Sequence, residues 1–535
     1  MCGISISWGS RGQIIFGHFQ ARFEHLRPRG PDSSCTETIS INNIDIALGF
    51  CRLAIQGTGQ SSEQPFRLDG GRLVLVNGEI YNAAKLQPQA FGCGESDCVI
   101  IAKLLDSGMP MVEVCRQLDG DFAIADINPA AGTITVARDP YGVRPLFFAR
   151  YENGSCAVAS EIKGLYGSGF PCEVHQVAPG MVFEWPLFGA KENSEAKKNS
   201  EAKAFHQVPW LKNPLMSCPI VSRTSVFRAF KSSVKKRMAR NSTVEIGACL
   251  SGGLDSSVVV AMAVSFLSRD DPTYNLKTFS IGMPGSPDLA AARRVANYLH
   301  TDHHEIIVTP DQCLDVIPEV IRAIESYDVT TVRASVGNYL VGQYIKKNCP
   351  QVKVVLNGDG ADELFGGYKY MRAAPSDAAF ETETTRLLEN IHFYDVLRSE
   401  RCMAAHGLES RSPFLDRQFV SVVRSIPTAQ LRPSADVIEK FVLRSVFMLA
   451  LPLDIVMRPK EAFSDGISPG GPAALSWYQI TRAKAKSCGL SEADWYRQEF
   501  DNWYCETEAG TIPEQWMPRF VTGATDPSAR TILNE

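Results

Sequence analysis

Residues 250–257, with the sequence LSGGLDSS, decide the fold of this chain. The apolar run 244–249 precedes them and predicts a buried strand, and the apolar run 258–264 follows them and predicts a helix. A loop rich in glycine and serine therefore joins the end of a strand to the start of a helix. Glycine lets the backbone approach a ligand closely, and the free amides and dipole of a helix N-terminus favour an anion.

Asp255 lies in the same loop and would repel a bare phosphate. Its presence is explained if a divalent cation, Mg²⁺, bridges its carboxylate to the phosphate. The GxxxxGK[ST] phosphate loop is absent from the chain. An unliganded glycine turn is the plainer reading of any Gly-Gly pair, but the whole string SGGLDSS resembles the pyrophosphate loop of the ATP pyrophosphatases. That resemblance implies cleavage of ATP to AMP and pyrophosphate.

Composition limits the class of protein. The chain has 535 residues, enough for two or three domains, and its net charge of −5 gives no basic surface for nucleic acid. Its 15 cysteines are scattered without CxxC pairs, which is typical of reduced thiols and predicts a cytoplasmic protein. No signal peptide is indicated, and the longest apolar run, 258–267, is too short to span a bilayer.

Cys2 follows the initiator methionine. We expect the methionine to be removed, which would leave a thiol and a free α-amine on one residue. The amine has a reference pKa of about 8 and can act as a base for the thiol. A cysteine at position two indicates little by itself, because an incidental buried thiol is the more common explanation.

The strings that follow Cys2 change this interpretation. They are RGPD at 29–32, RLAI at 52–55, NGEIYN at 77–82, ESD at 95–97, LDGDFA at 118–123, RDPYGVRPL at 138–146 and SEIK at 160–163. In this order and spacing they resemble the class II glutamine amidotransferase domain, an N-terminal-nucleophile glutaminase. The resemblance implies an αββα-layered domain over residues 1–188.

Free glutamine carries an α-carboxylate and an α-ammonium, and the resemblance implies partners for both. Arg52 would clamp the carboxylate, and Glu79 and Asp97 would hold the ammonium. Taken singly, each of these charged residues is more often part of a solvated surface ion pair. The glutamine-binding set implied by the resemblance is Arg52, Leu53, Ala54, Ile55, Gln56, Asn77, Gly78, Glu79 and Asp97.

The implied reaction is attack of the Cys2 thiolate on the side-chain amide of glutamine. By the resemblance, the Asn77 side chain and the Gly78 amide donate to the oxyanion that develops. The products are a thioester and ammonia, and water then releases glutamate. Around this site, short apolar runs at 73–76, 134–137 and 146–149 predict strands, and 99–105 predicts a helix outside two sheet layers.

A charged repeat, NSEAK at 193–197 and again at 199–203, lacks apolar periodicity. We interpret residues 189–206 as a flexible linker between domains. The second domain, 207–535, opens with an amphipathic pattern over 225–238 that predicts a helix. Strands are then predicted at 277–282, 305–308 and 352–356, with a helix at 289–299.

Strands alternating with helices predict a doubly wound parallel sheet, so the fold class is α/β in the second domain and α+β in the first. The motifs SGGLDSS, FSIG and NGDGADE all follow such strands. Because ligands bind at the carboxyl ends of parallel strands, these motifs are expected to meet over one nucleotide.

The two domains together resemble the glutamine-hydrolysing asparagine synthetases. Further matching strings are SPDL at 286–289, HHEI at 303–306, ESYDVTTVRAS at 325–335, GLESRSPFLD at 407–416, EK at 439–440 and KEAFSDG at 460–466. The family reaction adenylates the side chain of aspartate, and ammonia from glutamine then displaces AMP. An internal tunnel for ammonia is implied.

The resemblance also implies the residues of the second site. Those that would bind ATP are Leu250, Ser251, Gly252, Gly253, Asp255, Ser256, Ser257, Ile281, Asn357 and Gly358. Asp255 and Asp362 would hold Mg²⁺, and Lys460 would stabilise charge on phosphate and on the tetrahedral intermediate. Arg333 is a weaker candidate for an anion contact.

Asp359 departs from the family pattern, which has glutamate at this position. Aspartate keeps the charge and reaches one methylene less, which could misplace the acceptor carboxylate. The family role still makes Asp359 a catalytic candidate. The residues after Ser468 have no motif that the resemblance explains.

Three functions remain open at this point. The first is an asparagine synthetase that uses glutamine, aspartate and ATP, with a homodimer as one open arrangement. The second is a related amide ligase for another carboxylate, although the ring-forming relatives often lack the nucleophilic cysteine that Cys2 provides here. The third is a non-catalytic or storage role, which intact SGGLDSS and Lys460 argue against.

Overall fold

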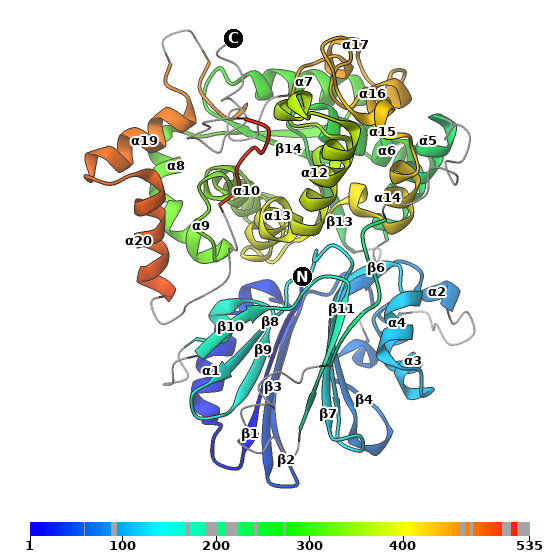
Figure 1. The fold of residues 1–535 in the computed structure, drawn as a ribbon, viewed down its shortest axis with the longest axis vertical. Coiled ribbons are helices and arrows are strands. Elements are labelled where there is room, and N and C mark those ends of the chain that lie inside the picture. Colours follow the sequence, from blue (N-terminus) through cyan, green and yellow to red (C-terminus); the bar gives the residue numbers. More distant parts are fainter. Residues whose placement is uncertain are drawn as a thin grey trace. The chain divides into compact units, whose positions relative to one another are not determined.

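The computed structural model describes residues 1–57, 59–86, 94–166, 172–187, 201–209, 223–239, 243–270, 274–460, 466–470, 474–504 and 515–521 (Figure 1). The chain forms two compact units. Unit 1 contains Met1–Gln207 together with Ala404–Leu408 and the described residues 502–504, and unit 2 contains the rest. Each unit therefore includes segments that are distant in sequence, and no single cut of the chain separates them.

Unit 1 is built on two antiparallel sheets of six strands each. The first has the order β10 (Cys172–Gln176), β8 (Phe147–Tyr151), β9 (Cys156–Ala159), β1 (Gly3–Ser10), β3 (Ile44–Arg52), β2 (Ser33–Ile41). The second has the order β12 (Glu201–Ala204), β11 (Met181–Pro186), β7 (Thr133–Arg138), β6 (Gly120–Asn128), β5 (Leu73–Ile80), β4 (Phe66–Arg67). The α-helices among the described residues of these first 207 positions are α1 (Phe16–Glu24), α2 (Ala83–Leu86), α3 (Val99–Asp106) and α4 (Met111–Gln117).

The alternation of side chains in β5 shows how the layers form. Leu73 and Leu75 point into the core between the two sheets, which also includes Ile4 and Ile6 of β1. Val74 and Val76 point to the other face, where they pack against α3 and α4. Because successive residues of a strand face opposite sides, a continuous apolar run can be buried on both. On the outer face of the first sheet, α1 packs so closely that a Cβ at Gly49 would lie 2.7 Å from the ring of Phe23. The predicted αββα order is confirmed.

The predicted linker, 189–206, is wrong in its last residues. Residues 189–200 lie outside the described part of the chain, but Glu201–Ala204 form β12, which pairs antiparallel with β11. Strand β12 is the edge of its sheet, and its described side chains from Ala202 to Ala204 are exposed. An edge strand with no buried face has no apolar periodicity, and charged residues are common there.

Unit 2 contains a parallel sheet with the order β15 (Asp302–Ile307), β14 (Lys277–Gly282), β13 (Glu245–Cys249), β16 (Val352–Leu356), β17 (Glu409–Arg411). The chain moves outward from β13 to β15 and then returns to place β16 on the other side of β13. Since crossovers between parallel strands are as a rule right-handed, connections that run in opposite directions from β13 are expected to put helices on both faces, as in a doubly wound sheet. The strand order reverses between β13 and β16, so a crevice for ligands is expected where these two strands end.

The helices of unit 2 connect and cover this sheet. Those that flank the first strands are α5 (Arg223–Arg237), α6 (Leu254–Asp270) and α7 (Pro287–Leu299). They are followed by α8 (Pro310–Asp315), α9 (Ile317–Ile324), α10 (Val329–Asn348), α11 (Ala361–Phe365), α12 (Asp377–Asn390), α13 (Asp395–Ala404), α14 (Arg417–Arg424), α15 (Thr428–Leu431), α16 (Phe441–Phe447), α17 (Leu453–Val456), α19 (Trp477–Ser487) and α20 (Glu492–Tyr504). Among the described helices, none combines the length and the apolar character that a membrane span requires.

Strand β17 was not predicted, and its composition explains why. All three of its residues are buried, although two of them carry charge. The Arg411 guanidinium donates through Nε to Glu409 Oε1 at 2.8 Å and through Nη1 to two backbone oxygens at 2.7 Å. A buried charged strand is tolerated only because its charges are paired, and that pairing cannot be seen in the sequence.

The core of the parallel sheet yields a stability prediction. We expect Ile246→Ala in β13, which is fully buried, to lower the free energy of unfolding by about 2–5 kcal/mol, because it leaves a cavity. The matched control is Ile307→Ala in β15, where the side chain is 54% exposed, and its effect should stay within about 0.5 kcal/mol. Urea unfolding measures both variants, and equal effects would contradict the observed burial.

Candidate active sites

The backbone of Cys2 is fixed on both sides in unit 1. Its nitrogen donates to Asn77 Oδ1 at 3.0 Å, and its carbonyl oxygen accepts from Arg29 Nε at 2.8 Å. Arg29 is itself buried in an ion pair with Glu161. The Cys2 Sγ lies 4.0 Å from the carbonyl oxygen of Leu53. The nucleophile predicted from the sequence therefore sits at the start of β1, next to the end of β3 and beside a residue of β5.

Asn77 and Gly78 have the properties of an oxyanion site. The Asn77 side chain is fully buried, and its Nδ2 has no hydrogen-bond partner among the described residues. An unpartnered buried donor costs free energy, so an acceptor that arrives with a substrate is expected to pair with it. A Cβ at Gly78 would lie 2.4 Å from the Asp121 carbonyl oxygen, so only glycine fits at this position.

The charged glutamine-site residues are buried and held by local contacts. Arg52, 6% exposed, donates to Glu63 Oε1 at 2.9 Å and to the Gly57 oxygen at 2.5 Å. Glu79 Oε2 accepts from Gln56 Nε2 at 2.5 Å.

The other predicted residues of this set lie in the same region. The Asp97 carboxylate accepts from the backbone nitrogen of Ile80. The nitrogen of Ala54 donates to Asp32 Oδ2 at 2.7 Å, and Ile55 is 3% exposed. The structure thus brings the predicted residues into one region of unit 1, with direct contacts joining Cys2 to Leu53 and Asn77, and Gln56 to Glu79.

Two further thiols lie near this site and differ from Cys2 in burial. Burial raises the pKa of the Cys51 thiol to about 12, and it raises the pKa of the Cys98 thiol well above its ordinary value. Because the thiolate is the nucleophile, both of these cysteines stay protonated and unreactive near neutral pH.

In unit 2, the loop 250–257 has the conformation that its sequence predicts. Gly252 has a φ of 73°, and a Cβ there would lie 2.4 Å from the backbone nitrogen of Ala292. Both the positive φ and the close approach exclude other residues. The Ser251 Oγ accepts from the Gly253 nitrogen at 3.3 Å, and the Ser256 Oγ accepts from the Ser251 nitrogen at 3.2 Å. The loop therefore opens α6 with several hydroxyls and amides grouped together.

The motif after β16 lies against the same loop. A Cβ at Gly358 would lie 2.9 Å from that of Asp255, so the two strand ends meet as predicted. Asn357 is held by Ser410 and Ser412, through contacts of 2.6 and 2.8 Å. The loop also contacts the neighbouring strand β14. The nitrogen of Leu250 donates to the oxygen of Phe279 at 2.8 Å, and Phe279 lies two residues before Ile281 in that strand.

A buried lysine that was not predicted as a site residue links the two loops. Lys440, 2% exposed, places its Nζ 2.5 Å from Asp255 Oδ2 and 2.7 Å from Asp362 Oδ1. Its backbone has a φ of 58°, at the start of α16. The sequence showed only that Lys440 belongs to a short matching string, and neither its burial nor its unusual backbone could be predicted from that.

Lys460, which was predicted, pairs with the same aspartate. Its Nζ lies 2.7 Å from Asp362 Oδ2. Burial alone would raise the pKa of the Asp362 carboxyl, but the ammonium groups of Lys440 and Lys460 hold that pKa well below its usual range. Burial alone would lower the pKa of Lys460, and Asp362 and Asp255 raise it instead. Asp362 and Lys460 are therefore both charged at neutral pH.

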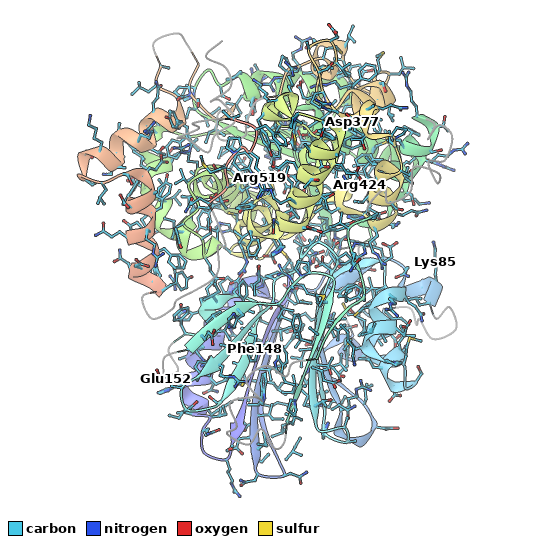
Figure 2. The ribbon with its side chains drawn as sticks, viewed as in Figure 1. Lys85, Phe148, Glu152, Asp377, Arg424 and Arg519 are labelled. Atoms are coloured by element: carbon cyan, nitrogen blue, oxygen red, sulfur yellow. The ribbon has the colours of Figure 1, made fainter. Side chains whose placement is uncertain are left out.

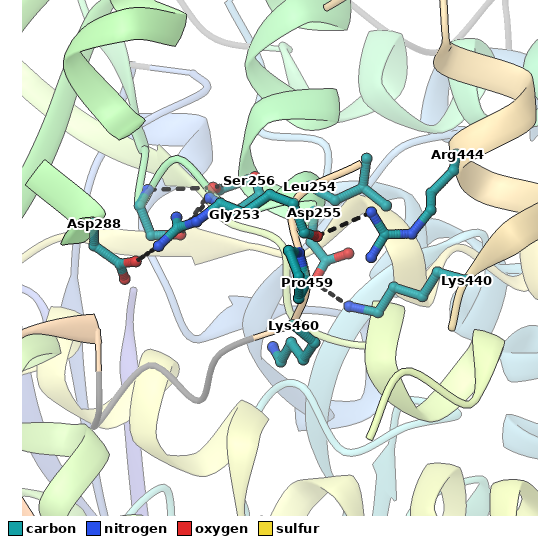
Figure 3. Close-up of a pocket in the computed structure, with 11 residues that line it drawn as sticks. Gly253, Leu254, Asp255, Ser256, Asp288, Lys440, Arg444, Pro459 and Lys460 are labelled. Atoms are coloured by element: carbon teal, nitrogen blue, oxygen red, sulfur yellow. Dashed lines mark hydrogen bonds and ion pairs between the residues drawn. The ribbon is translucent and has the colours of Figure 1, made fainter. Parts of the chain in front are cut away.

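These residues line a pocket at the start of α6 (Figure 3). Its lining is Ser251, Gly253, Leu254, Asp255, Ser256, Asp288, Lys440, Arg444, Arg458, Pro459 and Lys460. Figure 3 shows Lys440, Arg444 and Lys460 facing the loop. Four cationic side chains beside a helix N-terminus form a site suited to a polyphosphate. Residues 461–465 of the predicted lysine motif lie outside the described part of the chain.

Asp359 belongs to a partly buried ion cluster with Arg398 and Asp395. Its Oδ1 lies 3.3 Å from Arg398 Nη2, and Arg398 also pairs with Asp395 at 2.9 Å. The Asp359 Oδ2 is buried without a hydrogen-bond partner among the described residues, and burial raises the pKa of this carboxyl. The shorter side chain thus has a cationic partner on α13.

Arg333 is not part of the pocket lining. Its guanidinium forms a buried ion pair with Glu492 of α20, with Nε 2.7 Å from Oε1. It also lies over the ring of Tyr478, 4.6 Å from the centroid. The weaker expectation of an anion contact at Arg333 therefore has no support from the described contacts.

Lys440 provides a prediction about stability. Lys440→Met removes the buried cation that pairs with two largely buried carboxylates, 15% and 13% exposed, and we expect it to lower the free energy of unfolding by about 3–5 kcal/mol. The control is Lys277→Met, because Lys277 pairs with Glu245 at 2.9 Å while its side chain is 28% exposed, and its loss should cost about 1 kcal/mol or less. Urea unfolding at neutral pH compares the variants. A small effect of Lys440→Met would mean that Lys460 alone neutralises the site.

Comparisons with known proteins give a family for each part of the chain. A glutamine amidotransferase domain model matches residues 1–193, and an asparagine synthase model matches residues 225–379 and 372–487. Among solved structures, the allosteric regulatory enzyme of purine biosynthesis aligns with a TM-score of 0.33 and 16% identity, covering 57% of this chain and 80% of that one. The fold assignment rests on the sheet topology above.

Similarity to full-length relatives is much stronger. The glutamine-hydrolyzing asparagine synthetase of Bos taurus is 39% identical, that of Rattus norvegicus 38% and that of Homo sapiens 36%. Each alignment covers 100% of this chain and 99% of the relative, so it includes the residues after Ser468. The chain belongs to the glutamine-hydrolysing asparagine synthetase family.

Proposed function

We propose that this protein makes asparagine from aspartate, with ATP as the energy source and glutamine as the nitrogen donor. One observation carries the proposal. A single chain that matches asparagine synthetases along its whole length holds Cys2 against Asn77 in unit 1, and in unit 2 its SGGLDSS loop lines a pocket with Lys440 and Lys460. The residue roles below extend the family assignment to individual side chains.

In unit 1, the Cys2 thiolate attacks the side-chain carbonyl carbon of glutamine. The C–N bond then breaks, and ammonia leaves with a proton. The unpartnered Asn77 Nδ2 is placed to donate to the oxyanion, together with the Gly78 amide. Removal of Met1 would give Cys2 the amine that takes the thiol proton. Arg52, Glu79 and Asp97 bind the charged end of glutamine by exchanging some of their present contacts for the ligand.

In unit 2, an oxygen of the aspartate side chain attacks the α-phosphorus of ATP and pyrophosphate leaves. Ammonia then attacks the acyl carbon, and AMP leaves with the bridging oxygen. The loop amides, Ser251 and Ser256 hold the phosphates, and the cations lining the pocket neutralise them. Lys460 is placed to stabilise charge in both steps.

Asp255 and Asp362 fit the hard-cation site that the family chemistry implies. Asp255 Oδ1 is buried with no hydrogen-bond partner among the described residues, and Lys440 already brings the two carboxylates together. Mg²⁺ is commonly held by one or two carboxylates plus substrate phosphates, and bound there it would reduce the repulsion between phosphate and aspartate. The described residues contain no group of three His, Cys, Asp or Glu side chains arranged for a metal, so the phosphates would have to complete the site.

Asp359 is compatible with the synthetase reaction in this setting. Arg398 holds one oxygen of its carboxylate, and the other is free of hydrogen bonds among the described residues. A fixed partner on α13 can compensate for the missing methylene by setting where the charge lies. The free cysteines of the described chain are those of a reducing compartment, and we place the enzyme in the cytoplasm.

Replacement of the nucleophile tests the proposal directly. We expect Cys2→Ala to lower glutamine-dependent asparagine formation by about 10³-fold or more, since no other thiol can take its place. With ammonium chloride as the nitrogen source, the same variant should make asparagine at the wild-type rate. Mass spectrometry of asparagine and glutamate provides the measurement. Loss of both activities would show that Cys2 serves the fold instead.

Asp359 gives a second test, confined to unit 2. Asp359→Asn removes the charge that Arg398 faces, and we expect the kcat of ammonia-dependent synthesis to fall by about 100-fold. Glutaminase activity should not change. Asp359→Glu is the control that retains the charge and should keep most of the activity. Full activity of Asp359→Asn would exclude a catalytic role for this carboxylate.

A further inference from the structure

The described segment near the C-terminus, residues 515–521, is docked onto the first turn of α10. The Trp516 nitrogen donates to Asp328 Oδ2 at 2.8 Å, and the Gln515 side chain accepts from the Val329 nitrogen at 3.2 Å. Asp328 also caps α10 by accepting from the Thr331 nitrogen at 2.8 Å. The segment thus completes the hydrogen bonding of a buried helix start, which a loosely attached tail would not do.

The Trp516 side chain is 7% exposed and packs among aromatic rings. Its ring lies 5.5 Å from that of Tyr368 and 6.1 Å from that of Tyr370. Phe520 lies 6.1 Å from Tyr370, and Arg519, labelled in Figure 2, lies 3.8 Å from Glu383. Such aromatic contacts bury large areas and have preferred geometries, so they restrict the rings that they touch.

Tyr368 connects two helices of the adenylation site. Its hydroxyl lies 2.5 Å from Glu363 Oε1 on α11 and 2.8 Å from Asp395 Oδ2 on α13. Helix α11 also carries Asp362, which faces the two lysines, and α13 carries Arg398, which holds Asp359. The position of the Tyr368 ring therefore affects both aspartates at once.

We propose that Trp516 is a positioning residue for the adenylation reaction, acting through Tyr368 on the helices that place Asp359 and Asp362. This inference rests on the proposed function of unit 2. Truncating Trp516 would leave a cavity beside Tyr368, and the ring could then leave the position that joins α11 to α13. Sub-ångström errors in the position of reacting groups lower rates strongly, so the effect should appear in kcat.

The test compares Trp516→Ala with Trp516→Phe in the full chain. In Trp516→Ala we expect the kcat of ammonia-dependent asparagine synthesis to fall by about 10–100-fold, with glutaminase activity unchanged in the same sample. Trp516→Phe keeps a ring against Tyr368 and should restore most of the rate. Trp503→Ala, a tryptophan of α20 that is 45% exposed, is the matched control and should behave as the wild type.

Hydrogen–deuterium exchange separates this inference from the proposed function. In Trp516→Ala, exchange should rise in peptides covering α11 and the first turns of α10, and not in β5 or β6. If the wild type makes no asparagine, the proposed function fails, and the exchange pattern still decides the positioning role.

A second variant distinguishes a positioning effect from a general loss of folding. Tyr368→Phe keeps the packing and removes only the hydroxyl that joins the helices, and we expect it to lower the same kcat while the glutaminase is unchanged. The inference is overturned if Trp516→Ala has wild-type kcat and exchange, or if it lowers both activities in parallel and Trp516→Phe does not restore them.

Discussion

One buried ammonium group connects the parts of the adenylation site. Lys440 Nζ lies within 2.7 Å of both Asp255 at the start of α6 and Asp362 on α11, and these helices follow the two strands between which the sheet order reverses. Two neighbouring carboxylates that are largely shielded from water would repel each other without a cation between them. The pairing therefore determines how closely the two loops can approach, and with them the pocket that faces the phosphates.

The same charges define what chemistry the pocket can support. Lysines and arginines on one side and a helix N-terminus on the other suit a polyphosphate, whereas the carboxylates require that some cation always neutralise them. In the protein itself the Lys440 ammonium neutralises the carboxylates, and a bound divalent ion would neutralise them together with it. Asp359 does not pair with either lysine in the described structure, because its cationic partner is Arg398 on α13. The hydroxyl of Tyr368 links that helix to α11.

The sequence was sufficient to predict what depends on local patterns. The strands at 277–282 and 352–356 were predicted with the bounds that the structure shows, and so was the parallel sheet that contains them. The strand predicted at 305–308 runs from Asp302 to Ile307, and its start was missed because its first residues are polar and not buried. Strands β12 and β17 were missed, one because it is an exposed edge and the other because its buried charges are paired.

Contacts between distant residues could not be predicted. Lys440 is one of many lysines in the sequence, and only the structure shows that it is buried between two aspartates. The contact of Trp516 with Tyr368 joins residues far apart in the chain for the same reason. Family motifs gave Cys2 as the nucleophile and Asn77 as an oxyanion donor, but the free Nδ2 of Asn77 is visible only in the packed unit.

The central claim is that an oxygen of the acceptor acid attacks the α-phosphorus of ATP. Aspartate labelled with ¹⁸O in its side-chain carboxylate tests it most directly, with glutamine and ATP supplied and the products read by mass spectrometry. Transfer of one ¹⁸O to AMP, with one retained in asparagine, is the predicted result. Unlabelled AMP, or label in inorganic phosphate with ADP formed, would contradict the assignment.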